Sequence, residues 1–428
     1  MDFLKTSEGK NFIEHHWWHY KEVIPENILP TIPKPLCFLA RPDSICVQIQ
    51  EGDRTIHTSY FVGVDWINEK QAIYVEPKLN KDSNEQTNYI KLLFSTLNYP
   101  LDAYYTADLF EIKWEKPQIE IDDEQDLLTP LLVVQFLKIV REIVRKGLKK
   151  SYYKLEHNLY SKVKGKVLVS KTIKRNLLKN KQLYTFCGYD EFGWNGLENR
   201  LLKKALVFVQ RYLPSIKNAD AAKFTSDAFN FINPAFDFVS EEVNLNDIKH
   251  TKQNAFYKEY GEGLRLAKLI LRRFGYNISN TQKKKILTPP FWIDMSKLFE
   301  LWVLGKLREK YDNIIYQAAG KGVFPDFLLN CGDKKMIIDA KYKTKYISDY
   351  DISDIRQLSG YSRDEKILKK LGFTKKEWNS AVVDCLIIYP DQNVNEELFR
   401  NDETEIPGFI KFFKRPIRLP IIKDKLNS

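Results

Sequence analysis

The chain has 428 residues, enough for two or three domains, and its 43% hydrophobic and 13% aromatic residues can build their cores. No apolar run reaches about 18 residues, which excludes a membrane-spanning helix, and the amino terminus lacks the charged and apolar regions of a signal peptide. The five cysteines are scattered without metal-ligand spacing, which predicts reduced thiols and a cytoplasmic protein. The net charge of +11 suits a polyanionic partner, although a bias towards lysine would raise it as well.

Residues 1–122 are expected to form a β-rich domain, because short strand-like runs alternate with proline and glycine. The expected strands are Cys46–Gln50, Ser59–Val64, Ala72–Val75 and Leu109–Trp114. His15, His16 and His19 look like a metal cluster, but no further His or Cys follows at ligand spacing, so an aromatic segment that packs on this domain is preferred.

Residues 123–285 are expected to be mainly helical. The expected helices are Leu127–Leu148, Glu198–Tyr212, Asp220–Phe231 and Lys258–Phe274. A basic section begins with the alternating Lys162, Lys164 and Lys166, which would share one face of a strand, and continues to Lys181. Such a face could track phosphates, contact an acidic rim of a partner protein, or simply be solvated.

Residues 286–428 contain the most informative stretch, two strand-like runs at Val323–Leu329 and Lys335–Tyr342. The link between them holds Gly332-Asp333, a pair suited to a two-residue type II′ hairpin turn. With that turn, Asp326 lies directly opposite Asp339, with Cβ atoms roughly 4.5–5.5 Å apart. An odd-length loop would instead turn one acid to the other face.

Two carboxylates so placed repel each other unless a cation joins them. Mg²⁺ typically takes one or two carboxylates plus water and phosphate oxygens, so Asp326 and Asp339 are predicted to hold Mg²⁺, with Mn²⁺ as the alternative. Lys341 lies on the same face and could orient or deprotonate the attacking water, or neutralise charge on a phosphate. The competing interpretation, two solvated acids, is disfavoured because Ile337–Ala340 is too apolar for an exposed strand.

A predicted helix precedes the hairpin. Asp294–Val303 has the apolar spacing of a core-facing helix, and Glu300 points towards its apolar side. Glu300 is therefore a candidate third metal ligand, and the alternative is an acid at the edge of the apolar stripe that pairs with Lys297 or Lys306.

A second predicted helix follows the hairpin. It spans Asp354–Tyr361 and places Gln357 and Tyr361 on one face, where they could hold a water, a lysine or the DNA backbone, or serve only in packing. Ala381–Tyr389 reads as a further buried strand. This order of helix, hairpin, helix and strand resembles the PD-(D/E)xK nuclease superfamily, and it implies a restriction-endonuclease-like α/β domain within an α+β multidomain chain.

Further segments resemble the McrC family, the nuclease subunit of McrBC-type and LlaJI-type restriction systems. These segments are Ser59–Trp66, Ile73–Lys78, Val163–Val167, Tyr189–Phe192, Leu197–Leu202, Asp294–Val303 and Ile337–Lys343. The resemblance implies a Mg²⁺-dependent DNA endonuclease for phage defence, with Asp326, Asp339 and Lys341 as its catalytic residues and Glu300, Gln357 and Tyr361 as further site residues.

The same resemblance implies a partner, a hexameric McrB-like AAA+ GTPase whose pore receives the amino-terminal part of McrC and whose hydrolysis the chain stimulates. We therefore expect residues 1–122 to contact this partner. The chain has no phosphate-binding loop of its own. Target recognition is expected of the partner, and double-strand cleavage would need two nuclease copies. Two alternatives remain open: a stand-alone RecB-like repair nuclease, and a non-catalytic activator of an AAA+ protein.

Overall fold

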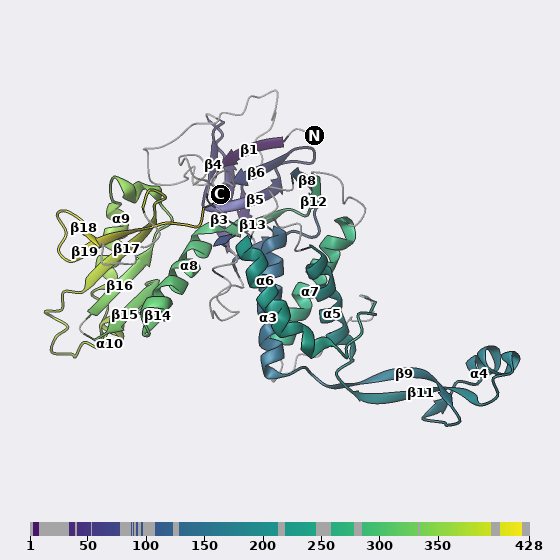
Figure 1. Cartoon of the computed structure of the whole chain (residues 1–428). Helices are drawn as coiled ribbons and strands as arrows, with labels where there is room; N and C mark the ends of the chain where they lie inside the picture. Colours follow the sequence, from purple (N-terminus) through teal and green to yellow (C-terminus); the bar gives the residue numbers. More distant parts are fainter. Residues whose placement is uncertain are drawn as a thin grey trace, which may run out of the picture. The chain divides into compact units, whose positions relative to one another are not determined.

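The computed structural model divides the chain into two compact units. The first comprises residues 1–130 and 282–428, and the second comprises residues 131–281. Both contain helices and strands, which confirms the expected α+β class (Figure 1). The expected three domains, with boundaries at residues 122 and 285, stay a prediction. The residues that the structure describes are 3–7, 34–38, 41–52, 54–77, 87, 89, 91–92, 96, 108–122, 128–212, 219–244, 258–277, 285–332, 334–394 and 403–421.

A five-stranded mixed sheet with the strand order β1-β6-β5-β13-β7 lies in the first unit. Its strands are β1 (Phe3–Ser7), β5 (Phe61–Trp66), β6 (Ala72–Glu76), β7 (Phe110–Ile112) and β13 (Phe291–Asp294). Strand β13 comes from much later in the chain and pairs antiparallel with both β5 and β7. Gly63 permits this pairing, because a Cβ at that position would lie 2.0 Å from the carbonyl oxygen of Phe291. The sheet is thereby joined to the helix that follows β13.

Two smaller antiparallel sheets belong to the same unit. Their strands are β2 (Leu36–Phe38), β3 (Arg41–Ile49) and β4 (Ile56–Thr58) in one, and β8 (Ile119–Asp122) and β12 (Lys285–Thr288) in the other. The four strands expected in the amino-terminal part are confirmed within β3, β5, β6 and β7. The histidine-rich segment with His15, His16 and His19 lies outside the described residues.

A six-stranded sheet with the order β14-β15-β16-β17-β19-β18 carries the hairpin predicted to be catalytic. Its strands are β14 (Ile314–Tyr316), β15 (Phe327–Cys331), β16 (Lys334–Ala340), β17 (Asp384–Pro390), β18 (Thr404–Glu405) and β19 (Phe412–Ile417). Strands β15 and β16 pair antiparallel, whereas β17 runs parallel to β16 and β19. The expected start of the first hairpin strand at Val323 was wrong, because Val323 closes a turn in which its carbonyl accepts from the N–H of Gly320.

Helices flank this sheet in sequence. They are α8 (Met295–Lys310), the short 3₁₀-helix η9 (Thr344–Ile347), α9 (Ile352–Tyr361) and α10 (Glu365–Lys370). The side chain of Asp294 caps α8 by accepting from the backbone N–H of Lys297. Helix α8 buries the residues of the predicted apolar stripe and also Leu301 and Leu304, so it is covered on more than one face.

The second unit contains a group of helices, in agreement with the four expected ones. They are α3 (Leu128–Lys146), α5 (Leu197–Tyr212), α6 (Ala219–Ile232) and α7 (Lys258–Asn277), with the 3₁₀-helix η5 (Asn233–Phe236) after α6. No described helix in either unit is long and apolar enough to cross a membrane. All five cysteines are free thiols.

A long hairpin extends from these helices and is called the arm below (Figure 1). It consists of β9 (Ser151–Tyr160), β10 (Lys166–Val167), α4 (Val169–Arg175), the 3₁₀-helix η3 (Leu177–Lys179) and β11 (Tyr184–Gly193). Strand β11 pairs antiparallel with β9 along its whole length. The strand expected to align Lys162, Lys164 and Lys166 was wrong, because the chain crosses from β9 to β10 there and only Lys166 lies in a strand.

Candidate active site

The hairpin that carries Asp326 and Asp339 has the predicted register. Phe327 pairs with Ile338 and Cys331 with Lys334, so the two strands are joined by a two-residue link that begins at Gly332. Gly332 has a φ of +60°, as such a turn requires. Asp326 directly precedes β15, and its Oδ2 accepts a 2.9 Å hydrogen bond from the backbone N–H of Ala340. The backbone of β16 therefore holds one predicted catalytic acid beside the other.

The two acids, Asp326 and Asp339, repel each other electrostatically. Asp339 is 2% exposed, and the ammonium group of Lys341 lies 2.8 Å from its Oδ2. The pKa of Asp326 is raised well above its ordinary value by burial and by the negative charges of Asp339 and Glu300. Buried acids that repel each other supply the negative charge that attracts a divalent cation, and two carboxylates are within the number that Mg²⁺ takes from proteins.

Lys341 completes the cluster. Its Nζ lies 2.8 Å from Asp339 Oδ2 and donates a 2.9 Å hydrogen bond to Gln357 Oε1. Burial alone would lower the pKa of this ammonium group, but the charges of Asp339 and Asp354 outweigh it and raise that pKa. Gln357 Nε2 in turn donates to Tyr361 Oη at 2.6 Å. The structure therefore brings Asp326, Asp339, Lys341, Gln357 and Tyr361 together, and their chemical roles stay predictions.

Glu300 lies nearby but has other partners. Its Oε1 is 3.3 Å from Lys297 Nζ and accepts a 3.2 Å hydrogen bond from Gln317 Nε2. Gln317 adopts a φ of +46°, rare for a residue other than glycine, and its backbone N–H donates to Asp326 O at 2.8 Å. Among the described residues no three acids, histidines or cysteines are arranged to hold a metal ion. The alternative pairing with Lys297 is thus present, and a ligand role for Glu300 stays a prediction.

Sequence reasoning missed three charged residues around Lys341, namely Lys343, Asp351 and Asp354. Asp354, in the first turn of α9, accepts hydrogen bonds from Lys343 Nζ at 2.9 and 3.1 Å and from Tyr346 Oη at 2.6 Å. Asp351 caps α9 and also accepts from Lys343 at 3.0 Å. The sequence does show two acids shortly before Gln357 and a second lysine shortly after Lys341. No spacing rule, however, predicts which side chains meet when the end of a strand packs against the start of a helix.

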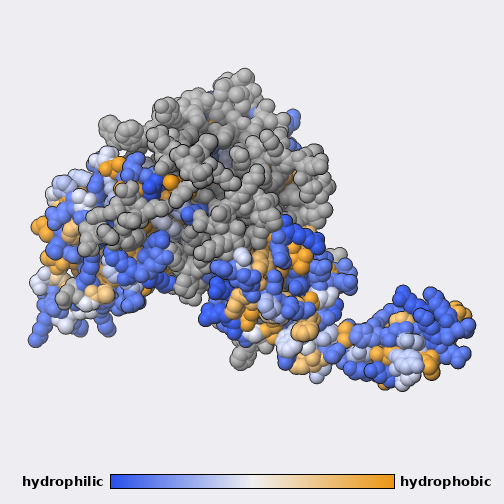
Figure 2. All heavy atoms as spheres, viewed as in Figure 1, coloured by the Kyte–Doolittle hydropathy of each residue, from blue (hydrophilic) through white to orange (hydrophobic). Residues whose placement is uncertain are grey.

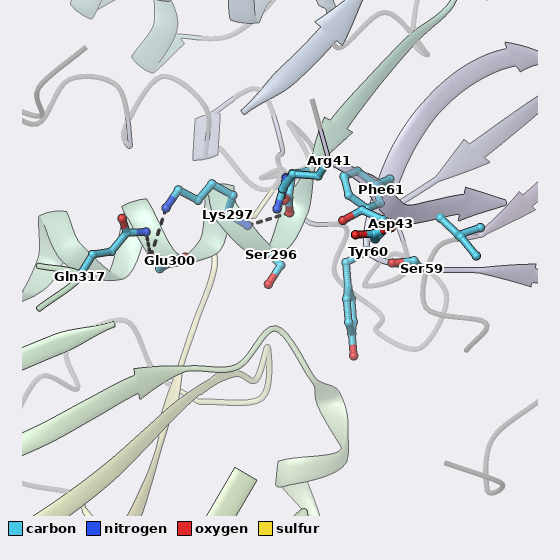
Figure 3. A pocket seen from close by; sticks show the side chains of 12 residues that line it. Arg41, Asp43, Ser59, Tyr60, Phe61, Ser296, Lys297, Glu300 and Gln317 are labelled. Carbon is cyan, nitrogen blue, oxygen red and sulfur yellow. Dashed lines mark hydrogen bonds and ion pairs between the residues drawn. The ribbon is translucent and has the colours of Figure 1, made fainter. Parts of the chain in front are cut away.

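A cleft of about 460 Å³ adjoins Glu300 (Figure 3). Its lining includes Arg41, Ser44, Ser59, Tyr60, Ser296, Lys297, Glu300 and Gln317. Arg41 forms an ion pair with Asp294 at 2.5 Å, and its guanidinium lies over the rings of Phe38 and Phe61. These contacts connect β3 to the start of α8, so the cleft is bordered by the helix that carries Glu300.

Asp65, within one of the resembling segments, has a structural role. It is completely buried, and its carboxylate accepts from Lys113, Lys116 and the indole of Trp292 at 2.7, 2.8 and 3.2 Å. A buried carboxylate with this many donors is satisfied. It joins β5, β13 and the segment after β7 rather than marking a second active site.

The arm exposes both cationic and apolar side chains, which are interspersed over its surface (Figure 2). The exposed basic residues include Lys154, Lys162, Lys164, Lys166, Lys171, Lys174, Arg175, Lys179 and Lys181. Tyr152 is 76% exposed and Leu178 75% exposed. Lys164 Nζ lies 4.0 Å from the centre of the Tyr189 ring, and Lys171 pairs with Glu156. The arm is therefore a candidate contact surface, because large apolar groups are costly to leave in water.

Comparison with known proteins identifies the family. A model described as McrBC 5-methylcytosine restriction system component matches residues 56–368. The chain belongs to this family. The match includes Asp326, Asp339, Lys341, Gln357, Tyr361 and the arm.

Two solved structures of McrBC assemblies are similar to the chain. One is described as a refined half-complex from a tetradecameric assembly of Thermococcus gammatolerans McrB AAA+ hexamers with bound McrC, at 16% identity and a TM-score of 0.39, covering 87% of this chain and 80% of that one. The other is a cryo-EM structure of the Thermococcus gammatolerans McrBC complex, at 16% identity and a TM-score of 0.27, covering 62% and 70%. No curated protein matches the chain.

Proposed function

We propose that the chain is the Mg²⁺-dependent DNA endonuclease subunit of a McrBC-like restriction system, with its carboxy-terminal sheet in the PD-(D/E)xK arrangement. The observation that supports this most is that Asp326, Asp339 and Lys341 lie together at the open end of the β15–β16 hairpin. Membership of the McrBC family supports it independently. Two carboxylates that repel each other and a half-buried lysine beside them are groups that metal-assisted phosphodiester hydrolysis uses.

In this mechanism Asp326 and Asp339 would hold Mg²⁺, with Glu300 as a further candidate ligand. The ion would supply positive charge to stabilise the charge that develops on the scissile phosphate. The charges of Asp339 and Asp354 raise the pKa of Lys341, which favours its ammonium form, and in this form it would donate a hydrogen bond to the attacking water or to a phosphate oxygen. Gln357 and Tyr361 fix the direction of the Lys341 ammonium group through successive hydrogen bonds.

The partner we propose is a McrB-like AAA+ GTPase hexamer, whose GTP hydrolysis the chain stimulates. The arm is the described surface best suited to contact it, because it exposes apolar and cationic side chains together. The contact expected of residues 1–122 stays a prediction beside it. Since one site cuts one strand, two copies of the chain would act in double-strand cleavage.

Plasmid cleavage by the full chain tests this function. Supercoiled plasmid is incubated with Mg²⁺ in four mixtures, with and without the AAA+ partner and with and without GTP. Cleavage only when partner and GTP are both present supports the restriction subunit. Cleavage by the chain alone would indicate a stand-alone nuclease, and stimulated GTP hydrolysis without cleavage would indicate a non-catalytic activator.

A further inference from the structure

Phe324 is an exposed aromatic residue beside the predicted catalytic acids. Its surface is 62% exposed, although Val323 before it packs against the hydrophobic core and Pro325 after it is buried. Only Pro325 separates it from Asp326. A single exposed apolar side chain is ordinary on a protein surface, so it is the position of Phe324 beside the predicted catalytic acids that distinguishes it.

The loop that presents Phe324 is fixed by hydrogen bonds. They run from Gly320 N to Val323 O at 2.8 Å, from Lys321 N to Asp364 Oδ2 at 2.7 Å, from Lys370 Nζ to Ala319 O at 3.0 Å and from Gln317 N to Asp326 O at 2.8 Å. The phenyl ring is therefore carried by a backbone anchored on both sides. Its exposure follows from how the loop is built.

The strand directions place Phe324 at the same end of the strands as the predicted catalytic residues. Strand β15 runs antiparallel to β16, so the residues before β15 lie at the end of the sheet where β16 finishes and Lys341 follows. Ile410 provides a contrast, because it is 84% exposed but precedes β19, which runs parallel to β17 and β16. Ile410 therefore lies at the opposite end of the strands of the same sheet.

We propose that Phe324 stacks on a nucleobase of the DNA strand at the cut site. This inference rests on the proposed function. A phosphate that reaches Asp326 and Asp339 brings its flanking nucleotides to the end of the strands where Phe324 lies. An aromatic side chain can stack on any base, because every base has a π face, so the contact needs no particular sequence. Phe324 then holds the strand near the acids while recognition of the target lies elsewhere.

Photocrosslinking tests what covers Phe324. Phe324→p-benzoylphenylalanine is introduced into the full chain carrying Asp339→Asn, so that the DNA stays intact, and is irradiated with labelled plasmid fragments, Mg²⁺, the AAA+ partner and GTP. The matched control is Ile410→p-benzoylphenylalanine. Adducts to DNA at position 324 and not at 410 support the proposal. Adducts to the partner alone, or equal DNA adducts at the two positions, would overturn it.

Cleavage by the assembled complex provides the second readout. Phe324→Ala should reduce kcat/KM for plasmid cleavage about tenfold, as expected for the loss of one base–aromatic stack, and Phe324→Trp should restore most of it. Ile410→Ala should cleave like the wild type. Unchanged cleavage by Phe324→Ala would contradict the proposal without affecting the nuclease assignment. If the wild type fails to cleave, the proposed function fails, and crosslinking still decides whether Phe324 contacts DNA.

Discussion

Asp354 Oδ1 lies 3.6 Å from Lys341 Nζ, which makes a buried acid of α9 the second carboxylate partner of the predicted catalytic lysine. Because Asp354 also accepts hydrogen bonds from Lys343 and Tyr346, it connects the catalytic strand to α9. We expect it to hold Lys341 in the direction that catalysis requires.

Asp354→Asn should therefore reduce the cleavage rate of the assembled complex by about tenfold, while DNA binding changes little, since the lost interaction orients Lys341 rather than the substrate. Single-turnover cleavage and DNA binding are measured on the same preparations. Asp351→Asn is the matched control, because Asp351 contacts Lys343 but not Lys341. Equal rate losses in the two variants would show that the effect is only structural.

Lys341→Met should reduce cleavage by about 10²–10⁴-fold, the usual contribution of one positioned catalytic group. The methionine chain preserves most of the packing and removes the ammonium. Lys343→Met, two residues further, should lose far less activity, because the acids that Lys343 pairs with are Asp351 and Asp354 rather than Asp339. If Lys341→Met cleaved at the wild-type rate, Lys341 would have no part in the reaction.

Mg²⁺ should stabilise the wild type. Binding at 100 times the dissociation constant adds about 2.7 kcal/mol to the free energy of unfolding, which a melting curve detects without any DNA present. Asp339→Asn should lose this Mg²⁺-dependent rise in melting temperature, because the amide carries no negative charge to hold the ion beside Asp326. A rise that persists in the variant would place the ion elsewhere.

Asp351 should make stability depend on pH in acid. Burial opposes the charge of its carboxylate, but hydrogen bonds from Lys343 and Ser353 lower its pKa from 3.8 to about 2. A depressed pKa gives stability that is complete above the unfolded-state value and is lost as the pH falls towards 2. The wild type should therefore exceed Asp351→Asn by about 2 kcal/mol in free energy of unfolding at pH 7, measured with urea. This difference should shrink between pH 4 and pH 2, and one that stayed constant would contradict the assignment.

Gly63→Ala should destabilise the first unit by about 3 kcal/mol or more, because its Cβ would overlap the carbonyl oxygen of Phe291 and separate β13 from β5. Gly52→Ala is the matched control, since nothing lies within 4 Å of a Cβ there. Thermal unfolding of the two variants measures the contrast. Equal melting temperatures would mean that β13 does not pack on β5 this closely.

The sequence predicted the catalytic hairpin well because local rules decide it. Gly332-Asp333 determines the turn, the turn determines the register, and the register places Asp326 opposite Asp339. The helices of the second unit were also predictable, since each carries an apolar face of helical period.

Contacts between distant segments were not predictable in the same way. Glu300 was named from the apolar stripe of its helix, but its hydrogen bond from Gln317 could not be foreseen, because Gln317 adopts a positive φ that no pattern around it indicates. The arm was missed because Cys187 is the one buried residue of β9 and β11, so these strands lack the buried face that gives a strand its alternating pattern. Strand β13 pairs with β5 across more than 200 residues, and only tertiary packing decides that.

The central claim is that Asp326, Asp339 and Lys341 form the site that cuts DNA. The most direct measurement is Mg²⁺-dependent plasmid cleavage by Asp339→Ala in complex with the AAA+ partner, with GTP hydrolysis followed in the same reaction. The account predicts that cleavage disappears while stimulated GTP hydrolysis continues at the wild-type rate. Cleavage that persists in Asp339→Ala would contradict it.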